Sequence, residues 1–369
     1  MERMDHIMSK YAFNESELQT GKTRFIFGCE FTDWDTPIAR RDNMLRSLKD
    51  DPVWLPSTFD YGYLFPKCVP DNPAKGNVSD YKLPPEELGG LDMFGIDWEY
   101  VPHVGGSTVR PGSPLLSDAN EWKEKVKFPT KEYIDSWDWE TAKKNADKLM
   151  PAKDFWEIVI CTGFYERLIS FMDFEEAAVA MIDEDQQDAI KELFDKLADL
   201  YILLIDKYLE VFGAENIDAV CLHDDWGHQR GIFFSPDTLR EMVVPYMKKV
   251  TDYIHAKGMI AECHSCGKVD PLIPLYIEAG FEMLECQPLL DFDKVIPQYG
   301  DKLIFHTSPD VPAPEAPEEE HIKAAHAYVD KMLSYGHPFL MDNYYSPHVL
   351  TKTFTDEVYR YSRQRLAEE

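Results

Sequence analysis

The chain is poor in basic residues: 38 Lys and Arg stand against 67 Asp and Glu among 369 residues, a formal net charge of −29. A surface of that charge repels nucleic-acid phosphates and anionic membranes, so we expect neither as a partner. The sequence also lacks an apolar run long enough to span a bilayer, because stretches such as LADLYILLID are short and interrupted by charge. No basic segment followed by an apolar one opens the chain, so we expect no secretory signal.

Cysteine is scarce and odd in number, with seven residues. An odd set of thiols in a large chain without a signal argues against a disulfide framework and favours reduced thiols in the cytoplasm. Neither a Gly-x-Gly-x-x-Gly pattern nor a P-loop follows any predicted strand, which argues against binding of dinucleotides or nucleotide phosphates. The sequence therefore predicts a cytoplasmic protein outside the common nucleotide-binding classes.

Apolar strand patterns and amphipathic helix patterns alternate from about residue 155 to 350. Strict alternation of this kind predicts parallel strands joined by crossover helices, an α/β fold. One helix is expected from Ser235, a good N-cap before Pro236, to Gly258 at its C-terminal end. We predict a single TIM-like (β/α)8 barrel over residues 51–369, preceded by an N-terminal helical extension over residues 1–50.

Residues 60–130 are rich in Pro, Gly and aromatic residues and are expected to form a long functional loop region. Reactive side chains also recur just after the predicted strands, where a parallel barrel gathers them at one end. These clusters are His223 to Asp225, His264 to Cys266, Glu285 to Gln287, His306 to Ser308, and Asp342 to Tyr345.

The stretch IAECHSCGKVDP carries the most specific of these clusters. Because side chains alternate along a strand, Glu262, His264 and Cys266 share one side, and Cys263 points to the other. An imidazole and a thiolate presented together suit Zn²⁺, and the further ligands could come from Cys286, Glu262, Glu285 or Asp342. Two alternatives stay open: a redox Cys-x-x-C pair, or buried core cysteines beside a hydrogen-bonded histidine.

The stretch CLHDDWGH places Asp224 and Asp225 at the end of a buried strand, beside His223 and Trp226. Adjacent carboxylates can have their pKa values pushed apart, which suits acid–base chemistry or cation binding. The alternative is a structural cap, and we expect one Asp to face the pocket and the other to be structural.

Asp342, Asn343, Tyr344 and Tyr345 come where the last predicted strand should end. The two tyrosines could bind an aromatic ligand or donate a proton, although aromatic residues also pack at strand ends.

Several segments resemble the uroporphyrinogen decarboxylase superfamily: LGGLDMFGIDWEY, the series DDWG…SP…P…H…G…HSCG, and YGDKLIFHTSPD. The resemblance runs from about residue 40 to the C-terminus and implies a TIM-like barrel. The superfamily includes decarboxylases and zinc-dependent methyltransferases that work with corrinoid proteins. The Arg-rich RQAGRY-type segment of the decarboxylases has no counterpart here, whereas His264 and Cys266 match the His-x-Cys of the methyltransferases. Thiol-methylating members carry a further Cys near the last strand, where this chain reads FLMDNYYSP, so Cys286 or a carboxylate would have to complete the zinc site.

The segment MFGIDWEY…PLLSDANEWKEKVKFP is similar to the branch that demethylates aryl methyl ethers. This resemblance implies transfer of a methyl group from an O-methyl donor to cobalamin carried by a separate corrinoid protein, with a homodimer as the family's frequent assembly. Candidate roles are zinc ligation by His264, Cys266 and Cys286, catalysis by Asp224, Asp225 and Tyr344, and substrate binding by His223, Trp226, His306, Asn343 and Tyr345. The alternatives are a decarboxylase of a small or porphyrin-like acid, a methylcobalamin:thiol methyltransferase, and a non-catalytic barrel that binds a ligand or a corrinoid protein.

Overall fold

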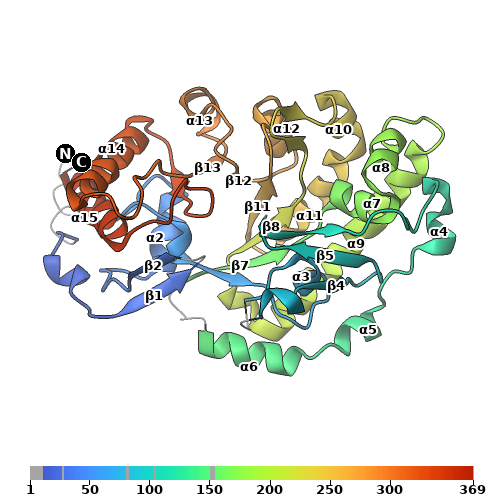
Figure 1. The fold of residues 1–369 in the computed structure, drawn as a ribbon, viewed down its shortest axis with the longest axis horizontal. Helices are drawn as coiled ribbons and strands as arrows, with labels where there is room; N and C mark the ends of the chain where they lie inside the picture. Colours follow the sequence, from blue (N-terminus) through green and yellow to red (C-terminus); the bar gives the residue numbers. More distant parts are fainter. Residues whose placement is uncertain (1–10, 27–28, 80–82, 104, 150–153, 369) are drawn as a thin grey trace. The chain divides into compact units, whose positions relative to one another are not determined.

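A computed structural model describes residues 11–26, 29–79, 83–103, 105–149 and 154–368 (Figure 1). The chain divides into two compact units. Unit 1 comprises residues 1–61, 153–155 and 286–369, and unit 2 comprises residues 62–152 and 156–285.

The central strands of unit 2 form a parallel sheet, in which β7 and β11 flank β8. The strands, some of whose end residues belong to unit 1, are β3 (Tyr61–Leu64), β7 (Phe155–Ile160), β8 (Ala219–His223), β11 (Ile260–Ser265) and β12 (Met283–Cys286), in the order β12-β11-β8-β7-β3. In the register of β8 and β11, Cys221 lies opposite Glu262 and His223 lies opposite His264. These residues therefore form successive layers at the carboxyl ends of the two strands.

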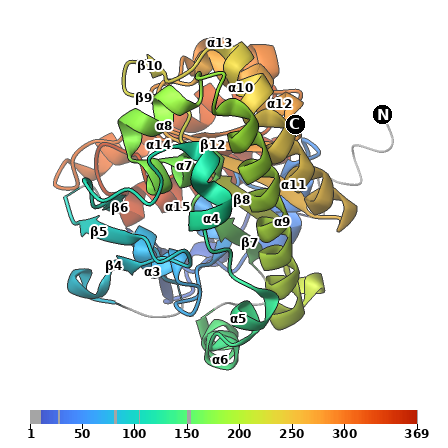
Figure 2. The ribbon, with the colours of Figure 1, turned by 90° about the vertical axis from the view of Figure 1, so that its right-hand side faces the viewer.

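Helices connect the strands of unit 2, as the alternating pattern predicts. They are α7 (Phe164–Met172), α8 (Phe174–Ala180), α9 (Gln187–Phe212), α10 (Pro236–Met242), α11 (Val244–Ala256) and α12 (Ile273–Glu278), with short 3-10 turns at η5 (Ala214–Asn216) and η6 (Asp270–Leu272). Helices α9 and α11 lie side by side (Figure 2). A parallel sheet with helical connections makes the fold α/β and is consistent with the predicted TIM-like barrel.

The segment expected as one helix from Ser235 to Gly258 forms two helices, α10 and α11, that meet at Val243. The reason is Pro245, which lacks an N–H and sits in the first turn of α11, where proline is tolerated, rather than inside a continuous helix. The predicted start is confirmed, since the Ser235 side chain accepts from the Thr238 N–H. Gly258 follows the end of α11 with a φ of 78°.

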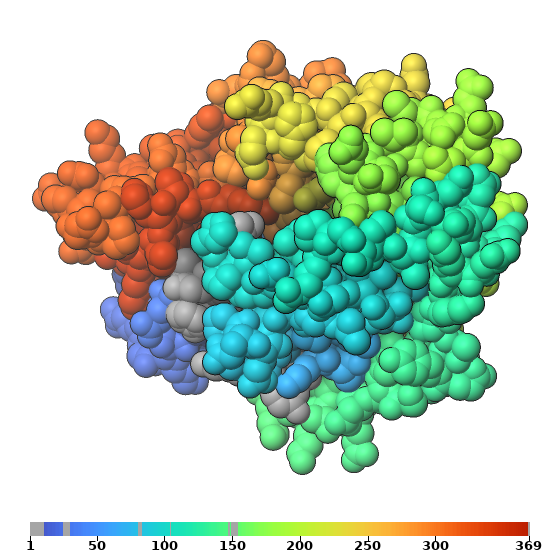
Figure 3. Space-filling view, turned by 45° about the vertical axis from the view of Figure 1, so that its right-hand side comes forward, coloured from blue at the N-terminus to red at the C-terminus, as the bar shows by residue number. Residues whose placement is uncertain are grey.

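The region predicted as a long loop contains regular structure. It holds α3 (Asp71–Lys75), the antiparallel strands β4 (Gly89–Leu91), β5 (Asp97–Val101) and β6 (Gly106–Val109), and the short helices η3 (Pro85–Glu87), η4 (Ala119–Glu121) and α4 (Trp122–Lys125). Helices α5 (Lys131–Asp135) and α6 (Trp139–Leu149) follow this region. Buried Arg167 of α7 pairs with Asp71 and with Asp92, whose carboxylate also accepts from Trp98 Nε1 at 3.0 Å. These ion pairs fix β4–β6 against α7, and in the space-filling view the region forms a continuous cyan and teal part of the surface (Figure 3).

Downstream of Asp225, a short hairpin of β9 (Gly227–His228) and β10 (Gly231–Ile232) follows β8 in unit 2.

Unit 1 contains η1 (Glu15–Leu18), β1 (Thr23–Ile26), β2 (Cys29–Thr32), α2 (Arg40–Ser47), η2 (Thr58–Asp60), α13 (Phe292–Tyr299), β13 (Ile304–Thr307), α14 (Glu318–Ser334), β14 (Phe339–Met341) and α15 (Lys352–Glu368). Strands β13 and β14 are parallel, and β1 and β2 form an antiparallel hairpin. Segment 1–50 is thus not purely helical: its described part holds this hairpin as well as α2. Buried Arg363 of α15 pairs with Glu17 at 3.0 Å, which ties this segment to the C-terminal helix.

None of the described helices is both long enough and apolar enough to cross a membrane.

Candidate metal centre and active site

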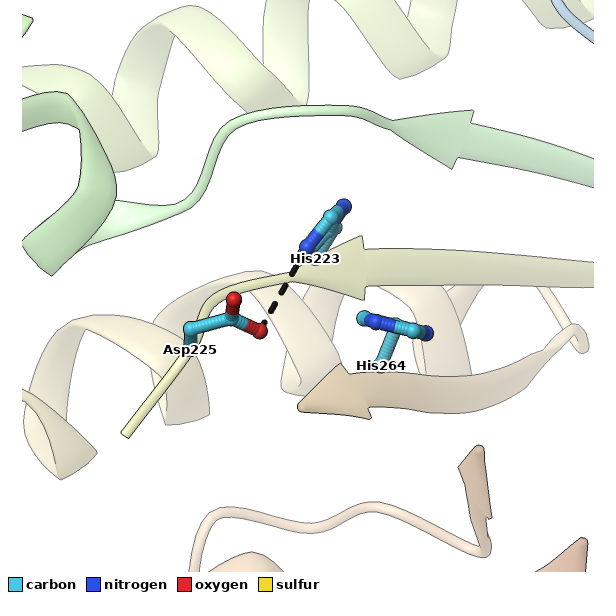
Figure 4. Close-up of side chains that lie close together, drawn as sticks. All are labelled: His223, Asp225 and His264. Carbon is cyan, nitrogen blue, oxygen red and sulfur yellow. Dashed lines mark ion pairs between the residues drawn. The ribbon is translucent and has the colours of Figure 1, made fainter. Parts of the chain in front are cut away.

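Three side chains meet at the carboxyl ends of β8 and β11, those of His223, Asp225 and His264, and the Cys266 side chain lies against His264. The two imidazole rings lie 4.2 Å apart between centroids, and His223 Nε2 lies 3.5 Å from Asp225 Oδ1 (Figure 4). His223, Asp225 and His264 each offer a ligand atom within 4.8 Å of the others. The strand register explains this meeting, because it sets His223 beside His264 and leaves Asp225 and Cys266 on the loops just beyond.

The His264–Cys266 pair has the spacing of two neighbouring ligands on one metal ion. Cys266 Sγ lies 3.4 Å from His264 Nε2, and Glu285 Oε2 lies 3.0 Å from the other ring nitrogen, Nδ1. Zn–S and Zn–N bonds of about 2.3 and 2.0 Å at a tetrahedral angle separate sulfur and nitrogen by about 3.5 Å. A carboxylate on the far nitrogen is the usual support of a zinc-binding histidine. The residues therefore fit a zinc ion, with His223 and Asp225 in reach as further ligands.

The site is strongly charged for its degree of burial. Burial would lower the pKa of His264, but the Glu285 carboxylate and Cys266 outweigh it and hold that pKa well above its usual value. Burial would likewise raise the pKa of Asp225, yet its contacts with His223 and the charge of His264 hold it well below its usual range. The Cys266 N–H also donates to Asp225 Oδ1 at 2.7 Å, so Asp225 orients the loop that carries the thiol.

Asp224 is held by hydrogen bonds inside the protein, and its predicted catalytic role stays a prediction. Its carboxylate is fully buried and accepts from the N–H groups of Tyr165 (3.2 Å) and Glu166 (2.9 Å) and from Trp226 Nε1 (2.8 Å). Burial raises its pKa to about 7. Asp224 therefore anchors the first turn of α7, whereas Asp225 is the carboxylate at the site, as expected for one of the two.

Trp226 is packed in the interior, and its predicted role in binding substrate stays a prediction. Its ring is fully buried and stacks on Tyr276 with 4.6 Å between centroids. With its indole N–H held by Asp224, it packs under the loop after β8.

Sequence reasoning missed two charged residues beside these side chains, Glu166 and Lys75. Glu166 Oε2 lies 3.8 Å from His223 Nε2, and Glu166 Oε1 accepts from Lys75 Nζ at 3.1 Å. Burial would lower the pKa of Lys75, but the carboxylates of Glu166 and Asp225 raise it above its usual value. Glu166 follows the end of β7, so the rule used for the other strands could have found it. Lys75 has no such signal, because it comes from α3.

Cys263 and Glu262, the β11 residues next to His264 and Cys266 in the sequence, are both buried. Cys263 is fully buried, and burial raises the pKa of its thiol well above its usual value, which disfavours a redox Cys-x-x-C pair. Glu262, on the His264 side of the strand, lies instead with Glu157 and Cys221 in a fully buried cluster. Burial and the neighbouring Glu262 carboxylate raise the pKa of Glu157 well above its usual value.

The remaining predicted site residues belong to unit 1: Cys286, His306, Asn343, Tyr344 and Tyr345. Buried Cys286 has its Sγ 3.7 Å from the His306 carbonyl oxygen, and Asn343 Oδ1 accepts from Thr58 Oγ1 at 2.6 Å. Tyr344 is 48% exposed and meets Tyr345 edge to face at 4.9 Å. Their participation in a common site with His264 stays a prediction.

The comparisons with known proteins address family and fold. A search of curated protein sequences gave no match. Among solved structures, a methyltransferase from Methanosarcina mazei aligns with 89% of this chain and 99% of its own length, at 14% identity and a TM-score of 0.56. Two other solved structures are too weakly similar to support any conclusion. An IOLI protein with a binding zinc atom aligns with 64% of this chain and 81% of its own length, at 10% identity and a TM-score of 0.31. The Bacillus megaterium spore cortex-lytic enzyme SleL aligns with 67% of this chain and 66% of its own length, at 8% identity and a TM-score of 0.32.

The first of these similarities shows a common fold. In sequence, the family described as Uroporphyrinogen decarboxylase (URO-D) matches residues 158–341, which include β8, β11 and all four residues of the candidate metal centre. The motifs that suggested this family lie largely within the matched range. The chain therefore belongs, through residues 158–341, to the uroporphyrinogen decarboxylase superfamily.

Proposed function

We propose that this protein is a zinc-dependent methyltransferase that moves a methyl group from an O-methyl donor, an aryl methyl ether, to cobalamin on a separate corrinoid protein. The observation that carries the proposal is the His264–Cys266 pair, with Cys266 Sγ 3.4 Å from one ring nitrogen and Glu285 3.0 Å from the other. Superfamily membership and the fold shared with a methyltransferase support an enzyme of this type.

His264 and Cys266 would hold the zinc ion, together with His223 or Asp225. Cys286, the third ligand predicted from the sequence, remains an alternative. When bound, zinc would supply a Lewis acid that polarises the ether oxygen of the donor. Glu285 keeps the His264 ring oriented by holding Nδ1, and Asp225 keeps Cys266 in place through its backbone N–H. Both are positioning residues, and together they preserve the spacing of the two ligands.

The test is elemental analysis of the purified protein, followed by a methyl-transfer assay. We expect about one zinc per chain, lost in His264→Ala and in Cys266→Ser. The control His228→Ala removes an exposed imidazole from β9 and should keep the metal. The zinc-loaded protein should methylate a reduced corrinoid protein from a methoxylated aromatic donor. Undiminished methyl transfer by a metal-free protein would contradict the zinc dependence, and a metal-free protein without methyl transfer would favour the decarboxylase alternative.

A further inference from the structure

A cavity of about 340 Å³ lies in unit 2 between the β5–β6 strands and helices α7 and α8. Its walls are mainly apolar, provided by Trp98, Val109, Ile169 and Phe174. This volume is at the small end of the range for ligand pockets, and apolar walls with a few polar groups are their usual composition. The cavity therefore suits a small molecule of about one substituted ring.

The lining also includes the charged residues Lys75 and Glu166. Lys75 is buried, with Nζ 3.1 Å from Glu166 Oε1 and 4.9 Å from the centre of the Trp98 ring. An ammonium group has three N–H donors, and Glu166 takes one; among the described residues no other accepts from it. Ser107 Oγ, also in the lining, is buried and makes no hydrogen bond to the described part of the chain. Buried donors without acceptors are costly, so the cavity is suited to a ligand that accepts hydrogen bonds.

Glu166 joins this cavity to the candidate metal centre. One of its oxygens holds Lys75, and the other lies 3.8 Å from His223 Nε2. The same carboxylate therefore borders both the cavity and the imidazole beside His264. A molecule held by Lys75 would lie next to the residues to which we assign the chemistry.

We propose that this cavity is the subsite for the methyl donor, and that the donor is a single aromatic ring bearing an anionic oxygen group, a carboxylate or a phenolate, that accepts hydrogen bonds from Lys75. The role of this ligand as methyl donor rests on the proposed function, whereas the binding of an aromatic anion in the cavity does not. The apolar walls receive the ring, and charge-assisted hydrogen bonds to a buried ammonium are stronger than neutral ones. The face of Trp98 is already occupied by Lys75, which disfavours a cationic ligand there. Asp173, a second carboxylate in the lining, already accepts from the Gly112 N–H at 3.2 Å.

The test is calorimetric titration of the protein alone with 3-methoxybenzoate, 3-methoxyphenol and methoxybenzene. We expect 3-methoxybenzoate to bind at least tenfold more tightly than methoxybenzene at neutral pH, with 3-methoxyphenol gaining affinity as the pH approaches that of its ionisation. Lys75→Met should weaken benzoate binding at least tenfold and remove the preference over methoxybenzene. The double variant Lys75→Met/Glu166→Gln, which leaves no buried carboxylate unpaired, should behave in the same way.

Two further variants sharpen the test. Ile169→Trp places a larger side chain in the cavity while residue 75 remains a lysine, and it should abolish binding of all three probes. The matched control is Lys123→Met, because Lys123 also contacts a tryptophan, Trp122 at 5.6 Å, and a glutamate, Glu192 at 2.5 Å, but on the surface. This variant should bind like the wild type. Unchanged benzoate binding in Lys75→Met, or no binding of any probe to the wild type, would overturn the inference.

The proposed function and the proposed subsite can be disproved independently of each other. If 3-methoxybenzoate binds as described but no methyl group reaches a reduced corrinoid protein, the proposed function is wrong and the aromatic-anion site stands. If methyl transfer from 3-methoxybenzoate proceeds with the same KM in Lys75→Met, the function stands and the subsite is wrong.

Discussion

Two adjacent residues of the same type, Asp224 and Asp225, have opposite environments. Asp224 is fully buried, and its carboxylate accepts hydrogen bonds from three N–H groups. Asp225 is partly exposed and lies beside two imidazole rings. Burial raises the pKa of the first to about 7, and the charged neighbours hold the pKa of the second well below its usual range. Sequence alone predicts that one of the pair is structural, but which one depends on the direction each side chain takes after β8.

Asp224→Asn should destabilise the protein by about 1–3 kcal/mol, because an amide nitrogen would replace one acceptor and face the N–H groups of Tyr165 and Trp226. Urea unfolding measures the loss. Asp225→Asn keeps an oxygen for the Cys266 N–H and should cost less stability while lowering zinc content. A stable but inactive Asp224→Asn protein would instead support the predicted catalytic role of Asp224.

Asp60, in unit 1, should make the free energy of unfolding depend on pH. It is fully buried, and desolvation raises its pKa from 3.8 to about 6 despite Arg40, whose Nε lies 3.8 Å away. The folded state therefore holds the proton more tightly than the unfolded state. The resulting stability is present below pH 4 and is lost as pH rises to 6, by about 3 kcal/mol.

Urea unfolding at pH 4, 5, 6 and 7 checks this expectation. Asp60→Asn should flatten the loss between pH 4 and 6, because its side chain is neutral throughout. The control Asp35→Asn, which changes an exposed carboxylate of the same unit, should keep the wild-type slope. An unaltered slope in Asp60→Asn would show that another group is responsible.

At the scale of elements, the turn from β7 to α7 sets the position of Asp224 and Glu166. Gly163 stands in this turn, where its N–H donates to the His223 carbonyl at 2.6 Å. A Cβ at this position would lie 2.5 Å from Asp224 Cβ and 2.8 Å from the His223 carbonyl oxygen. Only a residue without a side chain lets β7, β8 and α7 approach so closely.

Gly163→Ala should therefore destabilise the protein by about 1–3 kcal/mol and reduce zinc occupancy, since the overpacked turn would displace the loop carrying His223 to Asp225. Thermal unfolding and zinc analysis of the same sample test both effects. Gly106→Ala is the control, because a Cβ there meets nothing within 4 Å. Equal behaviour of the two variants would contradict the proposed role of the turn.

The elements that sequence predicts well are those with a local signal. The β11 strand with His264 and Cys266 on its end follows from an apolar run, and the Ser235 cap follows from Ser-Pro-Asp. The β4–β6 sheet was missed because its strands are short and their order depends on distant contacts, such as Arg167 with Asp92. Lys75 was missed for the same reason, since its place beside Glu166 comes from packing of α3 and not from a neighbouring motif.

At the scale of the whole molecule, the superfamily and the α/β fold could be predicted from sequence, and the ligand set could not. The HSCG motif places two proposed ligands at one strand end, so it is visible in the sequence. The further ligands of a zinc site come from other strands and leave no such local signal: His223 and Asp225 each offer a ligand atom within 4.8 Å of His264, and Cys286 stays a prediction.

Zinc binding by His264 and Cys266 can be tested by X-ray absorption spectroscopy of the purified protein, because this measurement counts sulfur ligands. We predict bound zinc with one sulfur at about 2.3 Å and nitrogen or oxygen ligands at about 2.0 Å. Cys266→Ser should remove the sulfur signal, and Cys286→Ser should leave it unchanged. Two sulfur ligands would instead bring Cys286 into the site. A protein without zinc, or with zinc that has no sulfur ligand, would contradict the assignment of His264 and Cys266.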